Sequence, residues 1–164
     1  MGLGVTAHKN VKKAPFQNWD ETEEWQEKNK KDYFKAFVIY VGWRNRISDL
    51  ENEVFYTSED SESFVRYSYR YHSFIRSQIC EMMGLHKDSW KNYALRPESD
   101  FEEWLNFADN EGCISWTTCK KLLKDFQKWQ PKAKEFLDEL TYNRYQDWIK
   151  TFEYASENGA VQYH

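Results

Sequence analysis

The sequence predicts a mainly α-helical fold, a single domain of packed amphipathic helices whose N-terminal third can contain a small β element. Three observations lead to this prediction. Apolar residues recur at helical spacing throughout the second half of the chain. The length of 164 residues suffices for one buried core without disulfides or metals. The 8 Trp, 11 Tyr and 11 Phe residues supply large rings for that core. We therefore expect one globular domain over residues 1–164, with a helical core at 67–164.

The N-terminal third carries weaker signals. Residues 1–18 are predicted to be irregular, except for a short strand at 3–7, where β-branched and other apolar residues alternate with neighbours. Residues 20–31 are highly charged and predict an exposed helix. The apolar run at 34–41 fits a strand or a buried helix, and its period does not decide between them. Residues 58–63 are acidic and serine-rich, which is typical of an exposed loop or a helix start.

From residue 71 onward the helical pattern is clear. An apolar face at 71–83 ends at Gly84, which predicts a C-cap with a hydrophobic contact from Leu85. Asp100 and Glu103 have the spacing of a capping box, which predicts a short helix that starts there. Gly112 ends the following turn, because glycine tolerates a backbone conformation that other residues avoid.

Two further helices share one apolar pattern. Starting at Trp116 and at Tyr142, apolar residues recur at offsets of about 0, 3, 6, 7, 10 and 13, which is the stripe of an amphipathic helix. Pro131 is expected to separate the first of them from a short helix at 132–140, and Gly159 to cap the last. The residues that follow, 159–164, are expected to add a short edge strand or to dock on the domain.

Composition excludes several classes of function. The formal net charge of −4 argues against general nucleic-acid binding, which needs a basic surface. No run of about 18 apolar residues and no signal-peptide pattern occurs, so we expect a cytoplasmic protein without a membrane segment. An odd number of cysteines without paired spacing indicates reduced thiols. The cysteines and histidines show no zinc-binding spacing, so we expect no metal and no cofactor.

The densest group of chemically versatile side chains is Tyr67, Tyr69, Tyr71, His72 and Arg76. His72 and Arg76 are four residues apart and share one face of a helix. Aromatic rings with Arg and His can stack a base and hold a phosphate. The structural alternative places Tyr71 in the core, with His72 and Arg76 on the surface.

The remaining candidates are more scattered. Asp109 and Glu111 offer two carboxylates before a helix, which suit acid and base roles or simply a turn. Lys121 and Asp125 have the spacing of a surface ion pair, and Lys121 can also contact a phosphate. A functional role for His164 requires the C-terminal segment to be held on the domain.

Several segments resemble a family of small uncharacterised bacteriophage and bacterial proteins. They are 107–114, 121–126, 148–153 and 159–164, which follow the pattern FxDxEGxI, KLxKDF and GAVxxH, together with 71–76. The resemblance covers residues 67–164, and Ser115 stands where the pattern has glycine. No activity is established for that family, so the resemblance implies a phage context and no mechanism. It contains most of the candidate residues, which predicts that they meet in a polar pocket between helices.

These features favour a non-enzymatic binding protein, a phage-encoded factor that engages a host protein through aromatic residues and Arg. The first alternative is a protein that binds or sequesters a nucleotide signal, with Tyr67, Tyr69, Tyr71 and Arg76 around the ligand. A deep pocket would favour this alternative, and a broad exposed patch would favour a protein partner. The second alternative is a hydrolase that uses Asp109, Glu111 and His72, which requires these side chains to lie close together.

Overall fold

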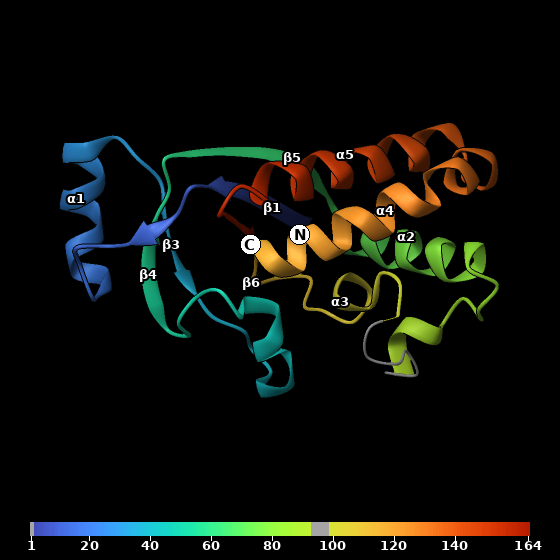
Figure 1. Cartoon of the computed structure of the whole chain (residues 1–164), viewed down its shortest axis with the longest axis horizontal. Helices are drawn as coiled ribbons and strands as arrows, with labels where there is room; N and C mark the ends of the chain where they lie inside the picture. The colour runs from blue at the N-terminus through green and yellow to red at the C-terminus, as the bar shows by residue number, and fades with distance from the viewer. Residues whose placement is uncertain (1, 93–98) are drawn as a thin grey trace.

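The computed structural model describes residues 2–92 and 99–164, which form an α+β fold with two antiparallel sheets (Figure 1). The larger sheet has the strand order β5 (Asp60–Ser68), β1 (Gly2–Lys9), β7 (Ala160–Tyr163), β6 (Gly112–Ser115). The smaller sheet has the order β2 (Lys12–Lys13), β4 (Val54–Thr57), β3 (Tyr33–Ala36). The α-helices are α1 (Thr22–Asn29), α2 (Tyr69–Met82), α3 (Glu102–Leu105), α4 (Trp116–Phe136) and α5 (Glu139–Ala155). Short 3-10 helices occupy Trp19–Glu21, Val41–Ile47 and Ser89–Asn92.

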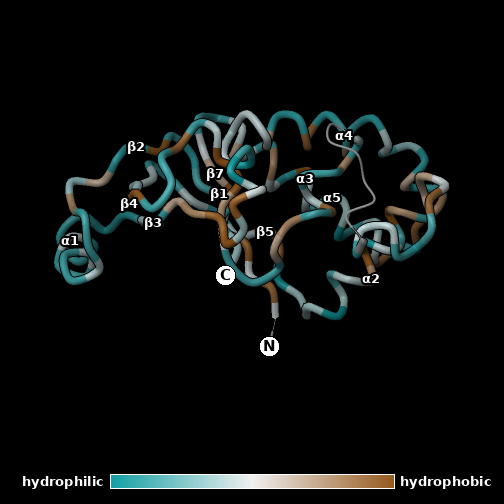
Figure 2. Tube along the Cα trace, turned by 90° about the horizontal axis from the view of Figure 1, so that it is seen from below, coloured by the Kyte–Doolittle hydropathy of each residue, from teal (hydrophilic) through white to brown (hydrophobic). Residues whose placement is uncertain are grey.

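The elements lie in layers, with α1 at one end, then the smaller sheet, the larger sheet and the long helices (Figure 2). Alternation along β1 explains this order. Leu3, Val5 and Ala7 are at most 1% exposed and pack in the main core with the helices. His8 faces the other side, where its ring lies 4.5 Å from that of Phe34 in β3. The larger sheet is therefore covered by helices on one face and, over part of the other, by the smaller sheet.

The prediction of a mainly α-helical fold is wrong, because the structure contains two antiparallel sheets. Strands β6 and β7 lie in the segment 67–164, which was expected to form a helical core, and β5 begins in a segment that was expected to be a loop or a helix start. Residues 2–18 are less irregular than expected, since the strand expected at 3–7 extends over Gly2–Lys9 and β2 follows it, while residues 14–18 form neither helix nor strand. Residues 60–63 form the start of β5 instead of a loop or helix, because Asp60 pairs with Lys9 and Ser61 with His8. The C-terminal segment forms a central strand and not an edge strand, since β7 pairs with both β1 and β6.

Two details of the helical half also differ from expectation. Pro131 lies inside α4 and does not end it. Both Pro131 and Gln127, whose carbonyl loses its i+4 donor, are exposed, so water can replace the missing hydrogen bond. Asp100 does not cap α3, because its carboxylate accepts from the Lys128 ammonium at 2.6 Å and from the Trp129 indole at 2.8 Å.

Other expectations are confirmed. The run at 34–41, for which strand and buried helix were both left open, is a strand at 34–36, within β3, and contains no α-helix. A helix, α1, lies within 20–31, and the apolar faces predicted at 71–83, 116–129 and 142–155 belong to α2, α4 and α5. Gly84 and Gly112 adopt positive φ values of 79° and 112°, as their predicted positions after helix and turn require.

We predict that Phe152→Ala lowers the free energy of unfolding by about 3–5 kcal/mol, because Phe152 is fully buried on α5 between Phe126 and Trp148. The matched control is Phe136→Ala, at the end of α4, where the ring is 42% exposed and its loss should cost less than about 0.5 kcal/mol. Urea unfolding of both variants measures the difference. Equal destabilisation by the two substitutions would contradict this description of the core.

Candidate functional site

The structure does not bring the candidate residues together in one pocket. Tyr67, Tyr71, His72 and Arg76 gather on the helical side of the larger sheet. Lys121 and Asp125 form a separate ionic group on α4. His164 lies on the opposite face of the sheet, next to Gly4. Among the others, Tyr69 packs against the main core, Asp109 is half-buried, and Glu111 is exposed.

The first group is a buried hydrogen-bond relay. The Trp148 indole N–H donates to the Tyr67 hydroxyl at 2.7 Å, and that hydroxyl lies 3.0 Å from Nδ1 of His72. Because the Tyr67 oxygen accepts from Trp148, its own proton is free to go to Nδ1, which leaves the His72 proton on Nε2. Burial, with a further contribution from the Arg76 charge, holds the pKa of His72 well below its ordinary value. His72 is therefore neutral and structural, and not on the surface as the structural alternative expected.

Arg76 is also interior, with only 3% of its surface exposed. Its Nη2 donates to the Phe107 carbonyl at 2.9 Å, and its guanidinium lies 5.1 Å from the ring centre of Trp90. The structure thus places Arg76 against the turn that follows α3, where a ligand from solvent does not reach it.

Lys121 is the centre of an ionic network and not a free cation. Its ammonium lies 2.6 Å from Glu103, 2.7 Å from Asp125 and 2.7 Å from the Ser99 carbonyl. Asp125 in turn accepts from the backbone N–H of Phe101 at 3.0 Å. Burial raises the pKa of both Glu103 and Asp125. These contacts hold the segment 99–105 against α4, so the role of Lys121 and Asp125 is structural.

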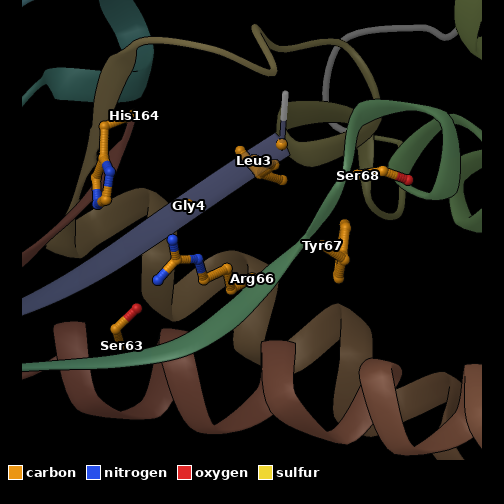
Figure 3. Close-up of a pocket in the computed structure, with 8 residues that line it drawn as sticks. Leu3, Gly4, Ser63, Arg66, Tyr67, Ser68 and His164 are labelled. Carbon is orange, nitrogen blue, oxygen red and sulfur yellow. The ribbon is translucent and has the colours of Figure 1, made fainter.

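The accessible candidate site is a half-open hollow of about 600 Å³ on the other face of the larger sheet (Figure 3). We refer to it as the sheet hollow. It is lined by Gly2, Leu3, Gly4, Ser63, Arg66, Tyr67, Ser68 and His164. Gly4 pairs with Arg66 on β5 and exchanges two backbone hydrogen bonds with His164. A side chain on Gly4 would meet the His164 ring at 2.8 Å, so glycine at this position lets the imidazole lie directly over β1.

Arg66 supplies the positive side-chain charge of the sheet hollow. Arg66 is exposed, and within the described residues its guanidinium makes no hydrogen bond or ion pair. None of the lining side chains is acidic. The Ser68 hydroxyl accepts from the Tyr71 N–H and so caps α2, which places the positive end of this 14-residue helix at the rim. The surroundings therefore favour an anion.

His164 is the titratable group of the sheet hollow. Its Nε2 lies 2.8 Å from the Thr6 hydroxyl. Partial burial, and then the nearby Arg66 charge, lower the pKa of its imidazole. An anion between Arg66 and His164 would reverse the second effect, because it would favour the protonated imidazole. The site can therefore couple anion binding to proton uptake.

Of the residues predicted from the sequence, only Tyr67 and His164 line the sheet hollow. The sequence prediction missed Arg66, Ser63 and Ser68, because the segment that contains them was not recognised as a strand. The signal that could have found Arg66 and Ser68 is the alternation over residues 65–68 of β5, where Val65 and Tyr67 are buried or half-buried and Arg66 and Ser68 are exposed. Their approach to Gly4 depends on strand pairing over more than 50 residues of sequence, which no local pattern contains.

Comparison with known proteins adds no template for this site. No family model matches the chain, and no curated protein or solved structure is significantly similar to it. The resemblance to phage proteins therefore stays a prediction. Within residues 2–92 and 99–164, no cluster of three or more potential metal ligands occurs, and no helix is long and apolar enough to cross a membrane.

We predict that the free energy of unfolding decreases as the pH falls below about 6.5, the ordinary pKa of histidine. His8, His72 and His164 all have lowered pKa values in the folded protein, each primarily because of burial. The unfolded chain therefore binds more protons, and the stability present above this pH is lost as it falls.

Urea unfolding between about pH 5 and about pH 7.5 measures this dependence. In His72→Gln the decrease should be shallower than in the wild type, because the most deeply buried imidazole no longer titrates. His86→Gln, which replaces an exposed imidazole, is the control and should keep the wild-type slope. A His72→Gln variant with the wild-type slope would contradict the assignment of a neutral, buried His72.

Proposed function

We propose that this protein binds a small phosphate-bearing ligand in the sheet hollow. The observation that carries the proposal is the position of Arg66, exposed and without an acidic partner among the described residues, across Gly4 from His164. A planar guanidinium is the side chain best suited to bidentate phosphate recognition. Ser63 and Ser68 also line the sheet hollow at either end of Arg66, where the Ser63 hydroxyl donates to the Val5 carbonyl at 2.8 Å and the Ser68 hydroxyl accepts from the Tyr71 N–H (Figure 3).

This proposal differs in rank from the sequence-based expectation, which put a protein partner first. A hollow large enough for a small molecule was the feature expected to favour a ligand, and its volume of about 600 Å³ lies within the range of small-molecule sites. The residues that grip the ligand also differ, since Tyr71, Arg76 and Lys121 are engaged elsewhere in the fold.

The hydrolase alternative is not proposed. It required Asp109, Glu111 and His72 to lie close together and reach a substrate. His72 is fully buried on α2, with Nδ1 in the relay with Tyr67, whereas Glu111 is exposed in the turn before β6. These positions support a structural role for His72.

We predict that Arg66→Ala weakens the binding of inorganic phosphate and of nucleoside monophosphates by roughly 10- to 100-fold, the effect of losing a charged hydrogen-bond partner. Isothermal titration calorimetry at about pH 6 and about pH 7.5 measures the affinity and, through the buffer dependence of the heat, proton uptake at His164. Arg44→Ala removes an exposed arginine outside the sheet hollow and should leave the affinity unchanged. No binding by the wild type, or equal losses in both variants, would contradict the proposal.

A second candidate function, engagement of another protein, is favoured by one specific feature. Ile39, Tyr40 and Val41 are consecutive large apolar residues, and they are 51%, 53% and 66% exposed. The Ile39–Val41 loop packs against the core through Tyr40. The centre of the Tyr40 ring lies 5.5 Å from that of Trp43, and the Trp43 ring centre lies 5.2 Å from that of Phe107. Exposed aromatic and aliphatic side chains on a rigid support are typical of protein interfaces. A phage-encoded factor that binds a host protein is one form of this proposal.

The test of this second candidate is affinity purification of the tagged protein from the cells in which it is naturally made, followed by mass spectrometry. We expect a stoichiometric partner that is lost in the double variant Ile39→Ser, Val41→Ser, because the apolar contact area is removed. Leu140→Ser, at a residue 57% exposed at the start of α5, is the matched control and should retain the partner. Retention by both variants would show that the Ile39–Val41 loop is not the contact.

A further inference from the structure

The imidazole of His164 takes the place of a side chain at Gly4. A Cβ atom on Gly4 would lie 2.8 Å from Cε1 and 2.9 Å from Nδ1 of His164. Gly4 is the cross-strand partner of Arg66, and directly opposite residues on one face of a sheet have Cβ atoms about 5 Å apart. The His164 ring therefore stands beside Arg66 as a cross-strand side chain would, and both residues line the sheet hollow (Figure 3).

The two nitrogens of this ring have different surroundings. Nε2 lies 2.8 Å from the Thr6 hydroxyl, which is the only hydrogen bond of the imidazole within residues 2–92 and 99–164. Because the two nitrogens of an imidazole point away from each other, Nδ1 is directed away from Thr6. The hollow lies on that side, since Gly2 and Gly4 line it and Thr6 does not. Nδ1 thus faces the space next to Arg66.

The charges around His164 leave its ring neutral. Partial burial, and then the charge of Arg66 on β5, lower the pKa of the imidazole from its ordinary value. Burial also lowers the pKa of His8, the other titratable side chain on this face of β1, and β6 carries no charged side chain. A neutral imidazole has one proton, and the hydrogen bond made by one nitrogen fixes that proton on the other. With the Thr6 hydroxyl as the donor to Nε2, the proton is on Nδ1 and points into the sheet hollow.

A phosphate between Arg66 and His164 would use three of its oxygens. A guanidinium binds phosphate through two parallel N–H···O hydrogen bonds, which occupy two oxygens. The Nδ1–H group then requires a third. A terminal phosphate has three free oxygens, whereas a phosphodiester has only two. The terminal group also carries more negative charge, which acts in the same direction.

We propose that the sheet hollow selects a terminal phosphate over a phosphodiester, with Nδ1 of His164 as the donor to the third oxygen and Thr6 as the residue that positions this donor. This inference rests on the phosphate binding proposed for the sheet hollow, and it adds the class of phosphate and the role of Thr6. The Ser63 and Ser68 hydroxyls have partners within the fold, so the selection depends on Arg66 and His164.

Methyl phosphate and dimethyl phosphate test the selection, because they differ in the number of free phosphate oxygens. NMR titration of the full chain at about pH 7.5 should give roughly 10-fold or more tighter binding of methyl phosphate. In His164→Ala this ratio should fall to about 3-fold or less, the part that charge alone maintains. Equal affinity of the wild type for both ligands, or an unchanged ratio in His164→Ala, would overturn the inference.

Variants of Thr6 test the positioning role. Thr6→Val keeps the volume and removes the hydroxyl, so the affinity for methyl phosphate should fall by roughly 3- to 10-fold, and Thr6→Ser should restore it. Thr57→Val, at a half-buried threonine of β4 outside the sheet hollow, is the control and should bind like the wild type.

Nitrogen NMR of the His164 ring gives a readout that a loss of stability would not change. We expect the proton on Nδ1 in the wild type and in Thr6→Ser, and we expect it to be no longer confined to Nδ1 in Thr6→Val. A wild-type ring with its proton on Nε2 would contradict the role of Thr6.

The same titrations separate this inference from the function on which it rests. If the wild type binds neither inorganic phosphate nor methyl phosphate, the proposed function and the selection both fail. If binding depends on Arg66 but does not distinguish methyl from dimethyl phosphate, the phosphate site stands and the selection is overturned. If Thr6→Val binds methyl phosphate like the wild type, the positioning role of Thr6 is overturned.

Discussion

The pairing of β1 with both β5 and β7 is the constraint on which the rest of the structure depends. It joins residues near the two ends of the chain, with Val5 opposite Tyr163 and also opposite Val65. Once β1 is held in the middle of the sheet, its alternation assigns every side chain to a face. The apolar set, Leu3, Val5 and Ala7, must be covered by helices. Gly4, Thr6 and His8 then lie on the opposite face. On that face His8 packs against the smaller sheet, and Gly4 lines the sheet hollow.

The buried aromatic residues with a polar atom fall into two sets. In one set this atom has a hydrogen-bond partner, and in the other it has none among the described residues. Tyr67 and Trp148 pair with each other, and the Tyr145 hydroxyl donates to a backbone carbonyl, so these residues combine large buried area with paired hydrogen bonds. Trp104 and Tyr163 are also buried, and Trp104 Nε1 and Tyr163 Oη have no hydrogen-bond partner within the part of the chain that the structure describes. A ring-rich core therefore brings many donors into the interior.

Accessibility separates the polar residues that hold the fold from those that can meet a ligand. His72, Arg76, Lys121 and Asp125 are the residues that local sequence patterns mark most clearly, and the fold uses them for contacts between its own elements. Arg66 and His164 contact no acidic side chain among the described residues, and they lie where solvent reaches them. The loop with Ile39, Tyr40 and Val41 is exposed in the same sense, although its chemistry suits an apolar partner.

The sequence by itself determined the long helices and several of their ends. The apolar stripes from Trp116 and Tyr142 depend on neighbours within a few turns, and the positive φ of Gly112 is a local property, so both can be predicted from short segments. The helical spacing of His72 and Arg76 also placed them correctly on one face of α2. Only the tertiary structure decided that this face is inside, because the rings of Trp104 and Trp148 come from other elements to cover it. It also decided that Ala160–Tyr163 is a central strand and that Arg66 meets His164 across Gly4. These outcomes depend on hydrogen bonds between strands far apart in the chain, and no local period contains that information.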